Sequence, residues 1–132
     1  SVSKLFVPKD YNFDAFFEAM YHWNPIINGA KYANNYDYNK AVYLMSEFKM
    51  LENGFLMIKE DESYASPIAT LFYEHYDSLE SLNKQLNVDA DKIQCIVSNQ
   101  LSEDHLHFGI TQTPQLEDYA DGVNTVDFLL KI

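Results

Sequence analysis

Cys95 is the only thiol in the chain of 132 residues, so a cysteine nucleophile within this chain would have to be this residue. It lies in the apolar run 93–97, which is typical of a buried strand. Burial of a thiol in apolar surroundings raises its pKa and makes it unreactive. We therefore predict that Cys95 is a core residue and not a catalyst.

His105 and His107 are the next candidates, because they flank Leu106 and would point to the same face of a strand. That spacing occurs in metal sites, but no third ligand is evident, since His22 and His75 are distant in sequence. We interpret the pair as histidines on a half-exposed strand and predict no metal site. The four glycines are isolated and form no phosphate-binding loop, and no nucleophile-elbow motif is present.

The charge of the chain restricts its partners. With 20 acidic and 9 basic side chains its formal net charge is −11, which opposes binding to nucleic acid or to an anionic membrane. CoA and dinucleotides are polyanions too, so a pocket for them would need cations or amide groups from elsewhere. No apolar run approaches the roughly 20 residues of a membrane span. With one cysteine and no signal peptide, we expect a cytoplasmic protein.

The first half predicts a strand and two helices around a long connection. Residues 4–7 predict a strand, and a helical apolar face follows it (Phe13, Phe16, Phe17 and Met20). Residues 21–39, rich in Asn and Tyr, predict a long loop, either a functional cover or binding segment or a surface loop pinned by buried rings. Residues 41–51 predict the second helix, with Gly54 at its C-cap.

The second half predicts a strand–helix–strand unit. The apolar runs 55–58 and 68–73 predict strands, and a helix with Leu79, Leu82 and Leu86 on one face follows them. Residues 93–97 predict a further strand, which would complete a right-handed βαβ crossover. We expect one α/β domain over residues 1–132, whose exposed sheet edges would favour a homodimer.

The last quarter of the chain carries a family resemblance. From His107 to Leu130 it runs HFGITQTPQLEDYADGVNTVDFLL, and the pattern FGxxQxPxLxDYADGVxTxxFL resembles the C-terminal end of LuxC-like acyl-CoA reductases, members of the aldehyde dehydrogenase superfamily. Residues 3–18 resemble the strand and helix that follow the catalytic cysteine in that superfamily. Residues 66–82 are similar to its FGPV strand and the next helix. The three blocks occur in the superfamily's order.

The resemblance implies the C-terminal portion of an aldehyde-dehydrogenase-like catalytic domain, with a mainly parallel sheet flanked by helices. It implies a parent enzyme that reduces fatty acyl-CoA to aldehyde with NADP- or NAD-derived hydride through an acyl-cysteine intermediate. The nucleophilic cysteine would lie upstream of Ser1, and the nucleotide-binding half would also be absent. We therefore expect this fragment alone to be inactive, to contain no catalytic residue and to bind no cofactor.

The resemblance also implies a few site residues. The superfamily carboxylate that contacts the nicotinamide ribose falls at Ser63 here, and Glu62 precedes it, so Glu62 is the candidate cofactor contact. The tail pattern implies an active-site environment that includes Phe108, Gln112, Tyr119 and Asp121.

Two alternatives stay open. The chain could be a stand-alone acidic α/β protein-interaction module, with residues 21–39 as its contact surface. It could also be a fragment of a general aldehyde dehydrogenase that oxidises free aldehydes. The sequence does not distinguish NADPH from NADH and does not indicate the acyl chain length.

Overall fold

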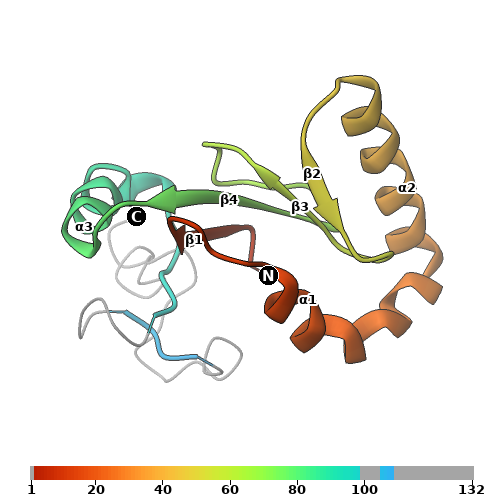
Figure 1. Ribbon diagram of the computed structural model, residues 1–132, viewed down its shortest axis with the longest axis horizontal. Helices are drawn as coiled ribbons and strands as arrows, with labels where there is room; N and C mark the ends of the chain where they lie inside the picture. The colour runs from red at the N-terminus through yellow and green to blue at the C-terminus, as the bar shows by residue number, and fades with distance from the viewer. Residues whose placement is uncertain (1, 99–104, 109–132) are drawn as a thin grey trace, which may run out of the picture. The chain divides into compact units, whose positions relative to one another are not determined.

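The computed structural model describes residues 2–98 and 105–108 (Figure 1). The chain divides into two compact units, residues 1–78 and residues 79–132, and each is described by itself. In the first unit, a sheet is accompanied by α1 (Asp14–Met20), the 3-10 helix η1 (Tyr21–Asn28) and α2 (Ala30–Met45). In the second, α3 (Leu79–Val88) leads into the short 3-10 helix η2 (Ala90–Lys92).

The sheet has four strands in the order β1-β4-β3-β2. They are β1 (Lys4–Pro8), β2 (Met50–Glu52), β3 (Met57–Glu60) and β4 (Thr70–Tyr76). β4 is parallel to both of its neighbours, β1 and β3, whereas β2 is antiparallel to β3. The α/β class is thus confirmed, with a mixed sheet in which the antiparallel edge strand β2 had not been predicted.

Each face of this sheet is covered by a different helix. Side chains of α1 pack on one face, against Val7, Ile58 and Leu71, as the apolar spacing of residues 13–20 predicts. Tyr36 and Tyr43 of α2 pack on the opposite face, against Met57 and Ala69. Because neighbouring residues of a strand point to opposite faces, Met57 and Ile58 reach one core each, and both are fully buried.

The predicted loop over residues 21–39 is wrong. Those residues form η1 and the first part of α2. Tyr32, Tyr36 and Tyr43 follow helical spacing and turn their rings toward the sheet, while the Tyr32 hydroxyl donates to the Phe55 carbonyl oxygen at 2.8 Å. A tyrosine can therefore serve as a core residue when its hydroxyl finds a partner.

The predicted helix over residues 41–51 is also wrong beyond Met45. α2 ends there, and residues 50–52 form β2, which pairs with β3 in an antiparallel hairpin. Gly54, with φ +92°, lies in the hairpin turn and not at a helix C-cap. The turn is closed by Asn53, whose Oδ1 accepts from the backbone N–H groups of Phe55 and Leu56.

In the second unit the helix is as predicted, but the strand after it is not. Leu82 and Leu86 of α3 are buried. The run 93–97 forms no strand; only Val97 makes an isolated parallel bridge, with Leu106. Gln94 and Cys95 within the run are exposed, so it lacks the burial on both faces that the βαβ prediction required.

Across residues 2–98 and 105–108, no helix combines the length and the apolar character that crossing a bilayer would require. Most of the tail pattern, from residue 109 onward, lies outside the described residues.

Candidate functional site

The connection between β3 and β4, residues 61–69, carries the candidate cofactor contact Glu62. It joins two parallel neighbouring strands without a helix. Asp61 extends the β3 ladder by one hydrogen bond, from its N–H to the Tyr73 carbonyl oxygen at 3.2 Å. The chain then leaves the sheet, which exposes both Glu62 and Ser63.

Lys59, the last residue but one of β3, binds the side chain of Asp61. Its whole residue is 6% exposed, and its Nζ pairs with Asp61 Oδ2. Three aromatic rings surround the ammonium group, with centroids at 4.2 Å for Phe48, 5.3 Å for Phe72 and 5.5 Å for Tyr43. The rings and the carboxylate together offset the cost of removing this charge from water.

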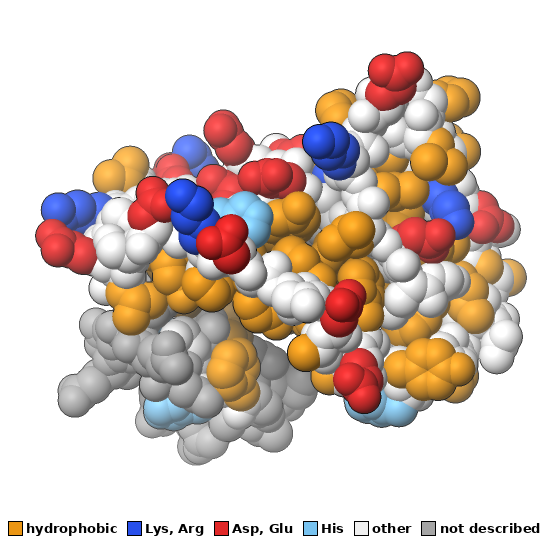
Figure 2. Space-filling model, in the orientation of Figure 1, with side chains coloured by type: hydrophobic (Ala, Val, Ile, Leu, Met, Phe, Trp, Pro, Cys, Tyr) orange, Lys and Arg blue, Asp and Glu red, His pale blue; other side chains and the backbone are white. Residues whose placement is uncertain are grey.

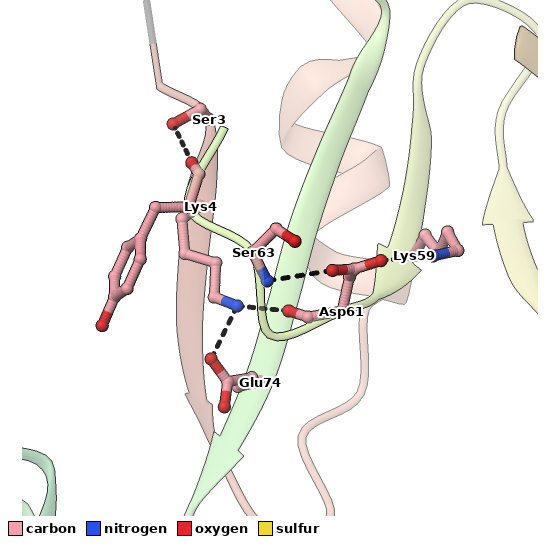
Figure 3. A network of polar contacts seen from close by, with 7 residues as sticks. Ser3, Lys4, Lys59, Asp61, Ser63 and Glu74 are labelled. Atoms are coloured by element: carbon pink, nitrogen blue, oxygen red, sulfur yellow. Dashed lines mark hydrogen bonds and ion pairs between the residues drawn. The ribbon is translucent and has the colours of Figure 1, made fainter. Parts of the chain in front are cut away.

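Lys4, at the start of β1, binds the same residue from the other side (Figure 3). Its Nζ donates to the Asp61 main-chain carbonyl oxygen and pairs with Glu74 Oε2 at 2.6 Å. Its side chain is also almost buried, at 6% exposure. Lys4 and Lys59 are both in register with Phe72 on β4, so they flank that strand on one face of the sheet.

Further hydrogen bonds hold the rest of the connection. Ser3 Oγ donates to the Tyr64 carbonyl oxygen at 2.6 Å, and Asn39 Nδ2 of α2 donates to the Ile68 carbonyl oxygen at 3.1 Å. The connection ends at Ala69, which has the left-handed φ of 66° and is buried. Residues 61–69 are therefore tied to β1, β3 and α2.

The electrostatics of the connection are set by Asp61. Its hydrogen bonds from Lys59 and from the Ser63 N–H, the latter at 2.9 Å, lower the pKa of its carboxyl to about 2. The carboxyl group of Asp61 is therefore ionised near neutral pH. Glu62 has no hydrogen-bond or ion-pair partner among the residues that the structure describes, so its carboxylate faces solvent from a fixed backbone.

This arrangement suits one kind of contact. An exposed carboxylate beside a serine hydroxyl can accept and donate hydrogen bonds to the hydroxyl groups of a ligand. It is unsuited to phosphate, because the two nearby lysines are buried and already paired with carboxylates. A dinucleotide or CoA would have to obtain its phosphate contacts elsewhere.

A second polar cluster joins α2 to the β2–β3 hairpin. The Tyr36 hydroxyl donates to Glu52 Oε2, and Lys40 Nζ pairs with Glu52 Oε1 at 2.8 Å. Burial, followed by the bond to Glu52, raises the pKa of Tyr36, whereas the hydrogen bonds from Lys40 and Tyr36 lower the pKa of Glu52. Both groups stay in their ordinary charge states, so the cluster is structural.

An open apolar pocket of about 220 Å³ lies where η1 meets the hairpin. On the face drawn in Figure 2, hydrophobic side chains are exposed over the first unit, with charged side chains among them. Trp23 is 60% exposed at the pocket. The pocket was not predicted, because its η1 residues fall in the segment that had been interpreted as a loop. Its lining consists of Met20, Trp23, Ile26, Tyr32, Phe55 and Leu56.

The remaining predicted residues are not brought together. Cys95 is exposed, so the prediction of a buried core cysteine is wrong. Among the described residues no three His, Cys, Asp or Glu side chains are grouped as metal ligands, and His105 is half-buried while His107 is exposed. Phe108 is 69% exposed.

Three further predicted site residues, Gln112, Tyr119 and Asp121, lie outside the described residues. The chain matches no protein-family model. Comparison with curated proteins and with solved structures gave no significant match.

Proposed function

We propose that this chain is the C-terminal part of the catalytic domain of an acyl-CoA reductase, which reduces fatty acyl-CoA to aldehyde. The observation that carries the proposal is the tail pattern from His107 to Leu130. The fold is compatible with it: β1 followed by α1, and β4 followed by α3, occur where the resembling blocks place a strand and a helix.

The connection 61–69 supports the proposal further. The resemblance places the cofactor contact at Glu62 or Ser63, and both are exposed side chains on an anchored stretch of backbone. A carboxylate or hydroxyl held in this way suits the ribose hydroxyls of a nicotinamide cofactor. Phosphate contacts would come from the nucleotide-binding half of the parent enzyme.

The proposed chemistry uses a cysteine upstream of Ser1. Its thiolate attacks the thioester carbon, the CoA thiolate leaves, and an acyl-cysteine forms. NADPH or NADH supplies the hydride that converts this acyl group to the aldehyde and releases the enzyme thiolate. Cys95 does not fit the nucleophile's place, because the resemblance puts that cysteine before residue 3.

The test uses the parent polypeptide in an assay of acyl-CoA-dependent NAD(P)H oxidation. We expect activity that is lost when the upstream cysteine becomes alanine. We also expect Glu62→Gln to raise the KM for the dinucleotide, while Glu18→Gln, a change in an exposed carboxylate on α1, leaves it unchanged. A parent that begins at Ser1, or that turns over no acyl-CoA, refutes the proposal. If the parent reduces NAD(P)⁺ with free aldehyde but shows no acyl-CoA-dependent oxidation of NAD(P)H, a general aldehyde dehydrogenase is favoured.

One observation favours the second candidate, a protein-interaction module. η1 exposes Tyr21, Trp23 and Ile26 beside the apolar pocket, and large exposed aromatic residues are enriched at protein interfaces. This function predicts that Trp23→Ala weakens binding of a purified partner while Met45→Ala, a change in an exposed apolar side chain at the end of α2, does not.

A further inference from the structure

We infer that Lys59 and Lys4 are positioning residues, which fix Asp61 between them and thereby hold Glu62 and Ser63 in place for a ligand. This inference rests on the proposed reductase function, in which the connection 61–69 contacts the cofactor. It assigns a role to two buried lysines that touch no ligand themselves.

The two lysines act on different atoms of one residue. Lys59 pairs with the Asp61 carboxylate, and Lys4 donates to the Asp61 main-chain carbonyl oxygen. The bond from Lys59 orients the side chain, and the bond from Lys4 adds to the hydrogen bond from the Asp61 N–H to the Tyr73 carbonyl oxygen in holding the backbone. Together they fix both the backbone and the side chain at the first residue of the connection (Figure 3).

The ammonium groups are themselves fixed. Lys59 is held by the rings of Phe48, Phe72 and Tyr43. Lys4 is held by Glu74 and lies 5.4 Å from the Phe6 ring centroid and 5.6 Å from that of Tyr64. A lysine normally keeps its long side chain mobile in water. Here the aromatic rings and Glu74 hold both lysine side chains in place independently of Asp61. We call Lys4, Lys59 and their contacts to Asp61 the support.

Asp61 is followed directly by the exposed residues Glu62 and Ser63. Asp61 Oδ1 accepts from the Ser63 N–H at 2.9 Å, which sets the backbone around Glu62. Lys59 contacts Tyr43 of the core between α2 and the sheet, whereas Asp61 lies beyond the last residue of β3. Loss of the Lys59–Asp61 pair should therefore displace Glu62 while β3 stays paired with β4, as expected of a residue that orients a binding group.

The test compares Lys59→Met with Lys84→Met in the parent enzyme, since Lys84 forms an exposed ion pair with Glu80 on α3. We expect Lys59→Met to raise the KM for NAD(P)H about tenfold, the low end for residues that orient a binding group. The KM for acyl-CoA should stay unchanged, and Lys59→Arg, which keeps the charge, should recover part of the loss. If Lys59→Met fails to fold, Lys4→Met, which keeps the Lys59–Asp61 pair, replaces it.

A second measurement needs no activity. Hydrogen exchange of amides 61–66 should be faster in Lys59→Met and unchanged in Lys84→Met, with α1 unaffected in both. Unchanged exchange overturns the inference. Faster exchange with an unchanged dinucleotide KM also overturns it, because the lysines would then stabilise the connection without positioning a contact, and the reductase proposal would stand. A parent without reductase activity removes both proposals.

Discussion

Removal of the Asp61 charge should lower the free energy of unfolding more than removal of Lys59. In Asp61→Asn the ammonium group of Lys59 stays in a site where its side chain is 8% exposed, without its counter-ion. Breaking a buried pair in this way costs about 3–5 kcal/mol. The three rings around the ammonium group offset part of that cost, at about 0.5–1 kcal/mol for each favourable contact. We expect a loss of about 2 kcal/mol in the free energy of unfolding.

In Lys59→Met the group left without its partner is the Asp61 carboxylate. The Asp61 side chain is 25% exposed and keeps the Ser63 N–H, so water can replace the lysine. A methionine side chain packs well against aromatic rings. We expect a loss of about 1 kcal/mol, close to the net value of one hydrogen bond. The double variant retains no unpaired charge, so its loss should be about 1–2 kcal/mol, less than the sum of the single losses.

The assay is urea unfolding of the chain at pH 7, followed by the fluorescence of Trp23, the single tryptophan, which belongs to the same unit as the pair. The control is Lys84→Met, whose exposed pair should contribute less than about 0.5 kcal/mol. Equal losses for Asp61→Asn and Lys59→Met, or additive losses in the double variant, would refute the reasoning.

The same pair gives a pH dependence with a defined sign. Because the folded state lowers the pKa of Asp61 from 3.8 to about 2, the pair stabilises the fold above about pH 4 and loses this effect as the pH falls toward 2. Because protonation leaves Lys59 without its counter-ion, as Asp61→Asn does, we expect a loss of about 2 kcal/mol. The loss should be absent in Asp61→Asn when unfolding is measured between pH 5 and pH 2.

Three other predictions concern single residues. Ala69→Gly should leave stability unchanged or raise it by up to about 1 kcal/mol, because φ is 66° there and glycine adopts that conformation without strain; a loss above that size in thermal unfolding would contradict it. Tyr36→Phe should cost about 1.5 kcal/mol in urea unfolding, since it removes a hydrogen bond to the charged Glu52. Cys95 should react with a thiol reagent in the native protein, because it is exposed; labelling only after denaturation would show that it is buried.

Short-range patterns predicted a good part of the fold. β1, α1 and α3 lie where apolar spacing placed them, because each carries apolar side chains at the spacing of its own strand or helix and is bounded by turn residues close in sequence. Such elements need no knowledge of distant residues.

The errors arose where distant residues decide the outcome. Tyr36 is buried and Tyr32 partly buried in α2, because the Glu52 carboxylate and the Phe55 carbonyl satisfy their hydroxyl groups, and neither partner can be identified from the local pattern. Residues 50–52 extend the helical spacing of α2, but pairing with β3 makes them a strand. Tertiary contacts override local propensity in both cases.

The candidate site was predictable only in part. The resemblance indicated Glu62, but it did not indicate what holds Glu62 in place. Lys4 and Lys59 had the pattern of ordinary strand residues, and lysine is rarely buried. Their burial depends on the parallel register that sets both beside Phe72 on β4, which no local pattern contains.

The family proposal and the positioning inference depend on different parts of the chain, and this makes them separable. The tail pattern at Gln112, Tyr119 and Asp121 lies outside the described residues, so its test is the activity of the parent enzyme. The support around Asp61 lies within the first unit, and stability and hydrogen exchange measure it without any substrate. If the support is rigid and the enzyme is active, the dinucleotide KM of Lys59→Met is the one quantity that connects them. A rise in that KM, together with faster exchange of amides 61–66 and an unchanged KM for acyl-CoA, would tie the buried lysines to the cofactor.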